Sequence, residues 1–328
     1  MDSRIDRRRL MLALAGVTAL GYPSNAAQAE DSWPTRIVKV IVPVGGGSGT
    51  DLFARFICDQ LSKRFAQTFI IENKPGANGM LGSDAVAKAD GYTLLFSNAS
   101  STVMLKGLNP KMPFDLEKDF TPIVQIGAGG VLLVVNPSLQ VKNVGELVEL
   151  IRSNPDKYNY GTWGVGSFAH LIMEGLKSKT GMQINHVPFK TMSQLQQSIL
   201  SGELQIGWSD AASGEALVRS GLLKVLCISG SHRSPKIPDM ATLKEQGFGF
   251  DNDGWYGLFA PTGVSQDIVD KVNLTVNQIM ESPEGRDYLQ RLNAPSAPPN
   301  TPAQFAETIQ NDIKTWTDVV RDNHITIE

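Results

Sequence analysis

The segment 45–51, with the sequence GGGSGTD, has the residue types of an anion-binding turn. It follows the strand-like run 37–42 and precedes a helical pattern that begins at Leu52, with Thr50 or Asp51 as the expected N-cap. The first turn of a helix leaves its N–H groups unpaired and carries the positive end of the helix dipole, so it stabilises carboxylate or phosphate oxygens. The pattern predicts either a ligand-binding loop or an ordinary tight turn.

The same segment lacks the chemistry of nucleotide binding. A phosphate-binding P-loop ends in Gly-Lys-Ser/Thr, but Gly49 is followed by Thr50 and Asp51. A dinucleotide fingerprint needs its third glycine three residues after the second, and Thr50 stands at that distance from Gly47. We therefore expect no nucleotide cofactor.

The first 29 residues have the pattern of an export signal. Arg7 to Arg9 precede the uncharged segment 10–20, and Ala27 to Ala29 offer a small-residue cleavage site. We expect cleavage near Ala29 and a periplasmic location, with the arginines compatible with the twin-arginine (Tat) or the general secretory (Sec) route. An uncleaved anchor is disfavoured because glycines and a proline interrupt the segment.

Composition narrows the partners and the cofactors. The net charge is -3 at pH 7, so the chain offers no general attraction to nucleic acid. Cys58 and Cys227 both fall in apolar patterns and are expected to be free thiols. The four histidines show no metal-ligand spacing, so neither a metal nor another cofactor is expected.

Short strand-like runs alternate with helical patterns along the chain, which predicts an α/β fold around a mainly parallel sheet. Three helices are expected near the end of the chain, at 265–280, 282–292 and 301–320, and Thr301 with Gln304 forms a capping box at the start of the third. The expected strands are 37–42, 69–72, 92–97, 121–126, 131–135, 159–161, 183–186, 204–208, 224–228 and 255–259.

Glycine-rich breaks at 129–130 and 247–254 divide the alternation into two blocks. After the export signal (1–29), we expect a discontinuous domain I formed by 30–128 together with 248–328, and a domain II formed by 129–247. A chain that leaves one block and later returns to it would build a two-domain clamp.

Several motifs follow the glycine loop in a fixed order along the chain. They are Glu72 to Gly79, Asp90 to Leu95, Val134 to Ser138, Gly164 to Ser167 with His170 and Leu171, His186 to Lys190, Arg233 to Pro235, Ile237 to Asp239 and Trp255 to Pro261, with Trp33 and Pro34 ahead of the loop. With this set the chain resembles the Bug-type (TctC-type) extracytoplasmic solute-binding proteins of the tripartite tricarboxylate transporter system.

The resemblance implies a type II-like periplasmic binding protein, a two-lobed Venus flytrap with its ligand cleft between two α/β domains. Such a protein is not an enzyme. It would act as a monomer that closes on a small carboxylate and delivers it to membrane permease subunits. Backbone amides and hydroxyls would grip the carboxylate, with Lys190 as the only formal cation of the loops. The implied ligand-binding residues are Val44, Gly45, Gly46, Gly47, Ser48, Thr50, Ser97, Asn98, Ser100, Thr162, Trp163, Gly166, Ser167, Phe168, His170, Phe189, Lys190, Ser209 and Asp210.

Departures from the family pattern bear on specificity. Trp163, Phe168, Phe189 and Trp208 would form an aromatic groove wall that favours an aromatic or hydrophobic carboxylate, unless these side chains belong to the core. Asp210 would either cap the following helix or accept a donor of the ligand, such as an amino or hydroxyl group.

Two other functions stay open at this point, as does the role of one histidine. The protein could be a periplasmic sensor or adaptor for a signalling partner. It could also be a secreted serine hydrolase, because residues 207–211 approximate a nucleophile elbow around Ser209, with Asp239 and His324 as the remaining candidates. His170 would either donate to a ligand carboxylate or serve the structure.

Overall fold

The computed structural model describes residues 33–109, 111–249, 253–292, 294, 297–322 and 325. The predicted export signal and His324 lie outside these residues. The chain divides into a segment 1–35 and a body that runs from Arg36 to Glu328, and the body carries all the elements below. Within the described part of the chain we find no helix long and apolar enough to cross a membrane.

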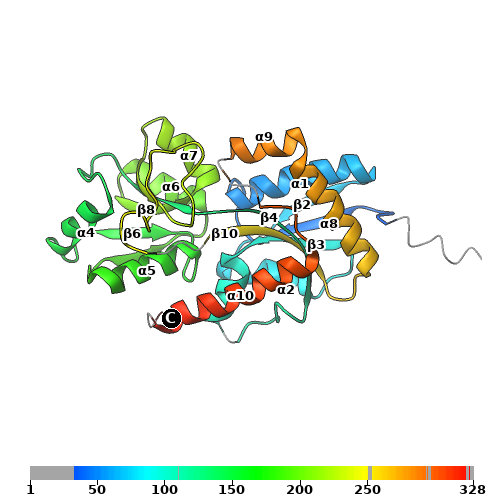
Figure 1. Cartoon of the computed structure of the whole chain (residues 1–328). Coiled ribbons are helices and arrows are strands. Elements are labelled where there is room, and N and C mark those ends of the chain that lie inside the picture. Colours follow the sequence, from blue (N-terminus) through cyan, green and yellow to red (C-terminus); the bar gives the residue numbers. More distant parts are fainter. Residues whose placement is uncertain are drawn as a thin grey trace, which may run out of the picture. The chain divides into compact units, whose positions relative to one another are not determined.

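The first lobe is built on a five-stranded sheet, sheet A, in the order β2-β1-β3-β10-β4. Figure 1 shows α1 and α8 on one face of this sheet and α2 and α10 on the other. The strands are β1 (Val38–Val42), β2 (Phe69–Asn73), β3 (Thr93–Asn98), β4 (Phe120–Gly129) and β10 (Gly254–Pro261). The helices are α1 (Gly49–Phe65), η2 (Ala77–Gly79), α2 (Met80–Ala87), η3 (Ser100–Met104), α3 (Leu105–Leu108), α8 (Gln266–Glu281), α9 (Pro283–Arg291) and α10 (Pro302–Asp322).

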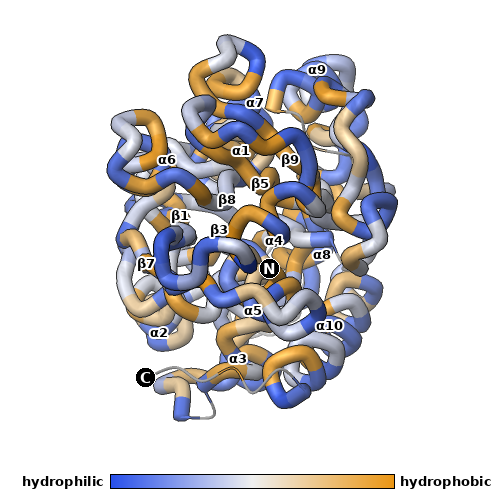
Figure 2. The backbone as a smooth tube through the Cα atoms, turned by 90° about the vertical axis from the view of Figure 1, so that its left-hand side faces the viewer, coloured by the Kyte–Doolittle hydropathy of each residue, from blue (hydrophilic) through white to orange (hydrophobic). Residues whose placement is uncertain are grey.

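The second lobe is built on sheet B, in the order β7-β6-β8-β5-β9. Its strands are β5 (Val131–Val135), β6 (Asn159–Thr162), β7 (Asn185–Pro188), β8 (Ile206–Asp210) and β9 (Lys224–Ile228). Its helices are α4 (Val144–Arg152), α5 (Phe168–Thr180), α6 (Met192–Ser201) and α7 (Ala211–Arg219). Figure 2 shows that the apolar segments include β5, all of whose residues are buried.

The expectation of a mainly parallel arrangement is confirmed, because four of the five strands in each sheet run in the same direction, and one strand in each sheet runs against them. Strand β10 is antiparallel to β3 and β4, and β5 is antiparallel to β8 and β9. Each of these strands follows directly after the chain crosses from the other sheet. It therefore starts at the sheet edge where the neighbouring strands β3 and β8 end, and it must run in the opposite direction.

The chain crosses from sheet A to sheet B between β4 and β5 and returns between β9 and β10. The expected domain boundary at 247/248 falls within the second crossover, and the one at 128/129 falls just before the last residue of β4, next to the first crossover. Their assignment as domain boundaries stays a prediction.

Local signals are confirmed at one helix start and corrected at another. At the start of α10, Thr301 N donates to Gln304 Oε1 (2.9 Å) and Gln304 N donates to Thr301 Oγ1 (3.2 Å), which is the expected capping box. The N-cap of α1 is Ser48, whose Oγ accepts from Asp51 N, so the expectation of Thr50 or Asp51 is wrong. The helix begins at Gly49, before the helical pattern that starts at Leu52. The pattern does not reveal this start, because a glycine adds nothing to an apolar periodicity.

Both cysteines are free and buried, as expected. Burial raises the pKa of the Cys58 thiol to about 12. This thiol is therefore protonated at neutral pH and inert as a nucleophile.

Candidate functional site

A cavity of about 650 Å³ lies between the two lobes. Its volume falls in the range of small-molecule sites. Loops that follow the carboxyl ends of strands line it: 43–50, 75–80 and 98–100 from the first lobe, and 163–165 with 189–194 from the second. Both sheets therefore direct their strand ends to one space.

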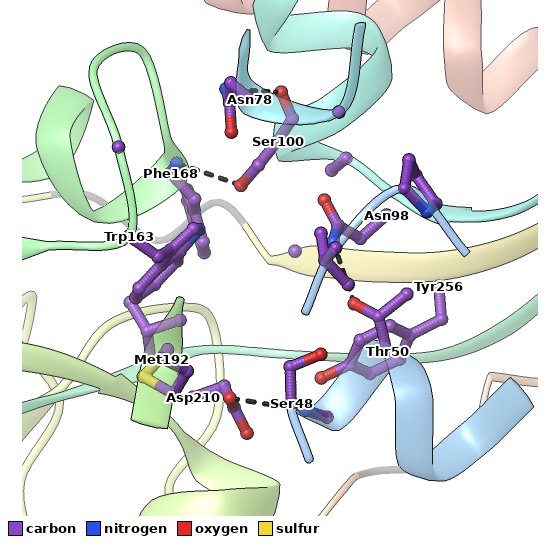
Figure 3. A pocket seen from close by; sticks show the side chains of 18 of the residues that line it. Ser48, Thr50, Asn78, Asn98, Ser100, Trp163, Phe168, Met192, Asp210 and Tyr256 are labelled. Atoms are coloured by element: carbon purple, nitrogen blue, oxygen red, sulfur yellow. Dashed lines mark hydrogen bonds between the residues drawn. The ribbon is translucent and has the colours of Figure 1, made fainter. Parts of the chain in front are cut away.

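The part of the first-lobe wall around the glycine loop carries small and polar residues held in place by hydrogen bonds, and Met80, Leu105, Trp255 and Tyr256 also line this lobe's side of the cavity. Ser48 Oγ donates to Gly45 O (3.0 Å), and Asn98 Nδ2 donates to Thr50 Oγ1 (2.8 Å). Because a hydroxyl both donates and accepts, Thr50 keeps its own O–H for another partner. Figure 3 shows Ser48, Thr50 and Asn98 on one side of the pocket.

The glycine loop is also tied to an ion pair behind it. Asp51 Oδ2 accepts from Gly47 N (2.9 Å) and pairs with Arg55 Nε (2.9 Å), and Asp51 Oδ1 accepts from Asn73 Nδ2 (2.9 Å). Burial by itself would raise the pKa of Asp51, but the hydrogen bonds from Arg55, Gly47 and Asn73 outweigh it and hold the pKa below its usual value. Arg55 thus holds the carboxylate of Asp51 that anchors the loop, and it does not line the cavity.

The second-lobe wall carries large apolar side chains. Trp163, Phe168, Phe189 and Met192 line the cavity, and Figure 3 shows Trp163, Phe168 and Met192 opposite the polar first-lobe wall. The expectation that Trp208 belongs to this wall is wrong. Trp208 is fully buried in the hydrophobic core of the lobe.

Hydrogen bonds join the lobes at different sides of the cavity. Phe168 N donates to Ser100 Oγ (2.9 Å), and Gly49 N donates to Asp210 Oδ2 (3.3 Å). At the second contact, a Cβ added to Gly49 would lie 2.9 Å from Asp210 Oδ1 and 2.6 Å from the hydroxyl oxygen of Tyr256. The lobes are closed on each other, and Gly49 allows this close approach.

Asp210 is the N-cap of α7. Its Oδ1 accepts from Ser213 N (2.7 Å), and its Oδ2 accepts from Ser213 Oγ (2.9 Å). Burial raises the pKa of Asp210, while the hydrogen bonds from Ser213, Gly49 and Ala212 lower it in part. Of its two alternatives, Asp210 therefore takes the role of helix cap, and its carboxylate also contacts Gly49 of the first lobe.

A cluster of buried polar residues supports the loop 163–167 from beneath. Gly166 N donates to His170 Nδ1 (3.1 Å), and Thr162 Oγ1 is hydrogen-bonded to His186 Nε2 (2.7 Å). The rings of His170 and His186 stack with their centroids 4.2 Å apart. Burial, with smaller effects of His170 and Lys177, lowers the pKa of His186 to about 3.

His170 itself is buried and absent from the cavity lining. Burial lowers its pKa, and Nδ1 already accepts from the loop. Of its two alternatives, the structural role matches this geometry.

The structure separates the expected ligand-binding residues into two groups. Those that line the cavity are Val44, Gly45, Ser48, Thr50, Asn98, Ser100, Trp163, Phe168, Phe189, Lys190 and Asp210. Those that do not line the cavity are Gly46, Gly47, Ser97, Thr162, Gly166, Ser167, His170 and Ser209. Most of the second group hold loops or cap helices, as Ser167 does for α5.

Sequence reasoning missed several residues of the lining, among them Asn78, Met192 and Tyr256. Asn78 and Tyr256 belong to motifs that were recognised in the sequence. Their closeness to the glycine loop depends on the position of η2 and on the crossover strand β10, which spacing does not reveal.

The serine hydrolase alternative has no support in this geometry. Ser209 is fully buried, donates to Asp210 O and accepts from Gln196 Nε2, so a substrate cannot reach it. Among the described residues no group of three or more His, Cys, Asp and Glu side chains could hold a metal ion.

Comparison with known proteins gives one consistent result. A model described as "Tripartite tricarboxylate transporter family receptor" matches residues 53–325. Protein BugT of Bordetella pertussis is 30% identical over 318 residues, which cover 95% of this chain and 97% of BugT. The solved structure of MatC from Rhodopseudomonas palustris with bound malate is 31% identical, with a TM-score of 0.83 over 88% of this chain and 100% of MatC. An R. palustris protein whose structure was solved with adipate is 29% identical, with a TM-score of 0.85, and the match covers 90% of this chain and 99% of the R. palustris protein.

Proposed function

The chain belongs to the tripartite tricarboxylate transporter receptor family, and on this premise we propose that it captures a small organic carboxylate and delivers it to membrane permease subunits. The family consists of periplasmic solute-binding proteins and not of enzymes. The proposal extends this membership to a ligand class and a partner.

The observation that carries the proposal is the closed cavity between the lobes. Hydroxyl donors such as Thr50 suit carboxylate oxygens without a buried arginine. The related structures with malate and adipate support the same ligand class. A ligand that touches both lobes binds the closed form better and shifts the population towards it.

The second-lobe wall favours an aromatic or otherwise hydrophobic carboxylate. Trp163, Phe168 and Phe189 offer ring faces and edges to the cavity, and Met192 adds an adaptable apolar surface. A short polar acid would leave this surface without a partner.

A thermal-shift screen over aliphatic, amino-acid, tricarboxylic and aromatic carboxylates tests the proposal. A ligand present at about 100 times its dissociation constant should stabilise the protein by about 2.7 kcal/mol. If a folded sample gives no shift with any of them, the carboxylate proposal is refuted. If succinate-like acids bind better than ring-bearing ones, the hydrophobic preference is refuted.

The variant Trp163→Ala sharpens this test. Loss of the indole should weaken the binding of ring-bearing carboxylates about tenfold and leave short aliphatic acids nearly unchanged. The matched variant Val44→Ala truncates the opposite wall and should change affinity about twofold at most. Equal losses for both ligand types would contradict a ring contact at Trp163.

Delivery to a permease and export are proposals that cells can test. Deletion of the gene should abolish uptake of the acid identified in the screen. The mass of the periplasmic protein should correspond to cleavage near Ala29, and its native mass to a monomer. Normal uptake in the deletion strain would favour the alternative of a sensor for a signalling partner.

A further inference from the structure

The start of α1, the anion-binding position that the glycine loop indicates, is already in contact with a carboxylate of this chain. Gly49 is the first residue of α1, and its N–H donates to Asp210 Oδ2 (3.3 Å) from the other lobe. Figure 3 shows Asp210 facing Ser48 and this helix start. A ligand carboxylate at the same place would meet a like charge.

The carboxylate of Asp210 is surrounded by hydrogen-bond donors that favour its ionised form against the effect of burial. Each of its oxygens accepts from an N–H group, Oδ1 from Ser213 and Oδ2 from Gly49, so neither oxygen needs a proton of its own. The starts of α7 and α1 both meet it with the positive ends of their dipoles. Among the described lining residues, the other formal charge is Lys190, which is exposed at the rim.

Capping of α7 does not require this charge. Serine, threonine and asparagine cap helices about as well as aspartate. The other helix starts of the second lobe that adjoin the cavity use neutral hydroxyls, Ser167 for α5 and Thr191 for α6. The negative charge of Asp210 is thus free to serve ligand selection.

We propose that Asp210 determines specificity by excluding a second carboxylate from the α1 end of the cavity, so that the ligand is a monocarboxylate. This inference rests on the proposed carboxylate-binding function. The ligand's single carboxylate binds away from Asp210, and the end next to Asp210 takes an apolar or hydrogen-bond-donating group. Burying a dicarboxylate would place two negative charges together away from water.

Isothermal titration calorimetry with matched acid pairs tests the inference. The pairs are hexanoate with adipate and benzoate with terephthalate, which differ by one carboxylate at constant carbon framework or ring. The unmodified protein should bind the monoacid of at least one pair at least tenfold more tightly than the diacid. Asp210→Asn retains a capping oxygen without the charge, and it should reduce that ratio to about threefold or less.

Two further variants make the result interpretable. Asp210→Ser retains the cap in another way and should behave like Asp210→Asn. Asp267→Asn makes the same change of net charge on the exposed first turn of α8, and it should leave the ratio unchanged. Melting curves establish that each variant is folded.

The possible failures can be told apart. If monoacids bind but the ratio is the same in the unmodified protein and both Asp210 variants, the inference is overturned and the proposed function stands. A diacid preference in the unmodified protein also overturns it. If neither these acids nor any carboxylate of the thermal-shift screen binds, the proposed function fails, and the inference fails with it.

Discussion

The two lobes line the same cavity with different kinds of residues. At the glycine loop and at Asn98, the first lobe presents short polar side chains and glycine backbone, and the network of Asp51, Arg55 and Asn73 holds this loop in place. Opposite this loop, the second lobe presents the large apolar side chains Trp163, Phe168 and Met192 and the carboxylate of Asp210, and the stacked pair of His170 and His186 lies beneath. The contrast indicates a general grip on carboxylates in the first lobe and ligand selection in the second.

The largest expected effect concerns the contact where the two lobes meet. Gly49→Ala should weaken ligand binding up to about 100-fold, because overpacking of this kind costs about 1–3 kcal/mol and falls on the closed state. Asp210 is fixed by Ser213 and cannot yield to the new methyl group, which also meets the hydroxyl of Tyr256 within the first lobe. Calorimetry measures the affinity, and a melting curve establishes that the variant is folded.

A matched control lies in the same loop. A Cβ on Gly46 would have its nearest neighbours at 3.8 Å, from the side chains of Asn73 and Asp51, so Gly46→Ala should retain nearly full affinity. If Gly49→Ala binds as tightly as Gly46→Ala, closure at Asp210 is not needed for binding. The two lobes would then not act together on the ligand through the contact of Gly49 with Asp210.

The next effect is a pH dependence of the unfolding free energy that arises from His186 in the second lobe. The pKa of His186 falls from 6.5 to about 3 on folding, so the unfolded chain binds a proton that the folded chain does not. Stability from this group is complete above about pH 6.5 and is lost as the pH falls towards 3. Between pH 7 and pH 5 it should account for about 2 kcal/mol of unfolding free energy.

Denaturant titrations at the two pH values measure this difference. In His186→Gln, the loss between pH 7 and pH 5 should be smaller by about 2 kcal/mol than in the unmodified protein. His232→Gln, at an exposed position of the same lobe, is the control and should retain the full loss. If His186→Gln lost as much unfolding free energy between pH 7 and pH 5 as the unmodified protein, His186 would not be a source of the pH dependence.

Much of the fold follows from local patterns. Strands such as β5 and β9 are found at their expected positions because apolar runs bounded by turn residues depend on nearby sequence alone. The helix α10 begins where Thr301 and Gln304 predict, for the same reason. Strand direction was not predictable locally, since β10 is antiparallel to β3 only because the chain returns from the other lobe.

The site shows the same limit. The glycine loop was evident because its chemistry is contiguous, and Thr50 and Ser48 line the cavity as expected. Trp208 and Phe168 both resembled wall residues in the sequence, yet only Phe168 reaches the cavity, because side-chain direction depends on the pairing of β8. The contact of Asp210 with Gly49 joins residues 161 positions apart, which no spacing could indicate.

The smallest effect compares two serine N-caps, one from each lobe. Ser48 Oγ accepts from Asp51 N (3.4 Å) and also donates to Gly45 O (3.0 Å), whereas Ser167 Oγ accepts from His170 N (3.3 Å) behind the cavity. Ser48→Ala and Ser167→Ala should each lower the unfolding free energy by about 1 kcal/mol. Ser48→Ala should also weaken carboxylate binding severalfold, because the loop that lines the cavity loses the hydrogen bond from Ser48 Oγ to Gly45 O that anchors it. Ser167→Ala should leave affinity intact, since Ser167 itself does not line the cavity. If Ser167→Ala weakened binding as much as Ser48→Ala, the second lobe would also contribute to the general grip on the carboxylate, and selection could not be assigned to it alone.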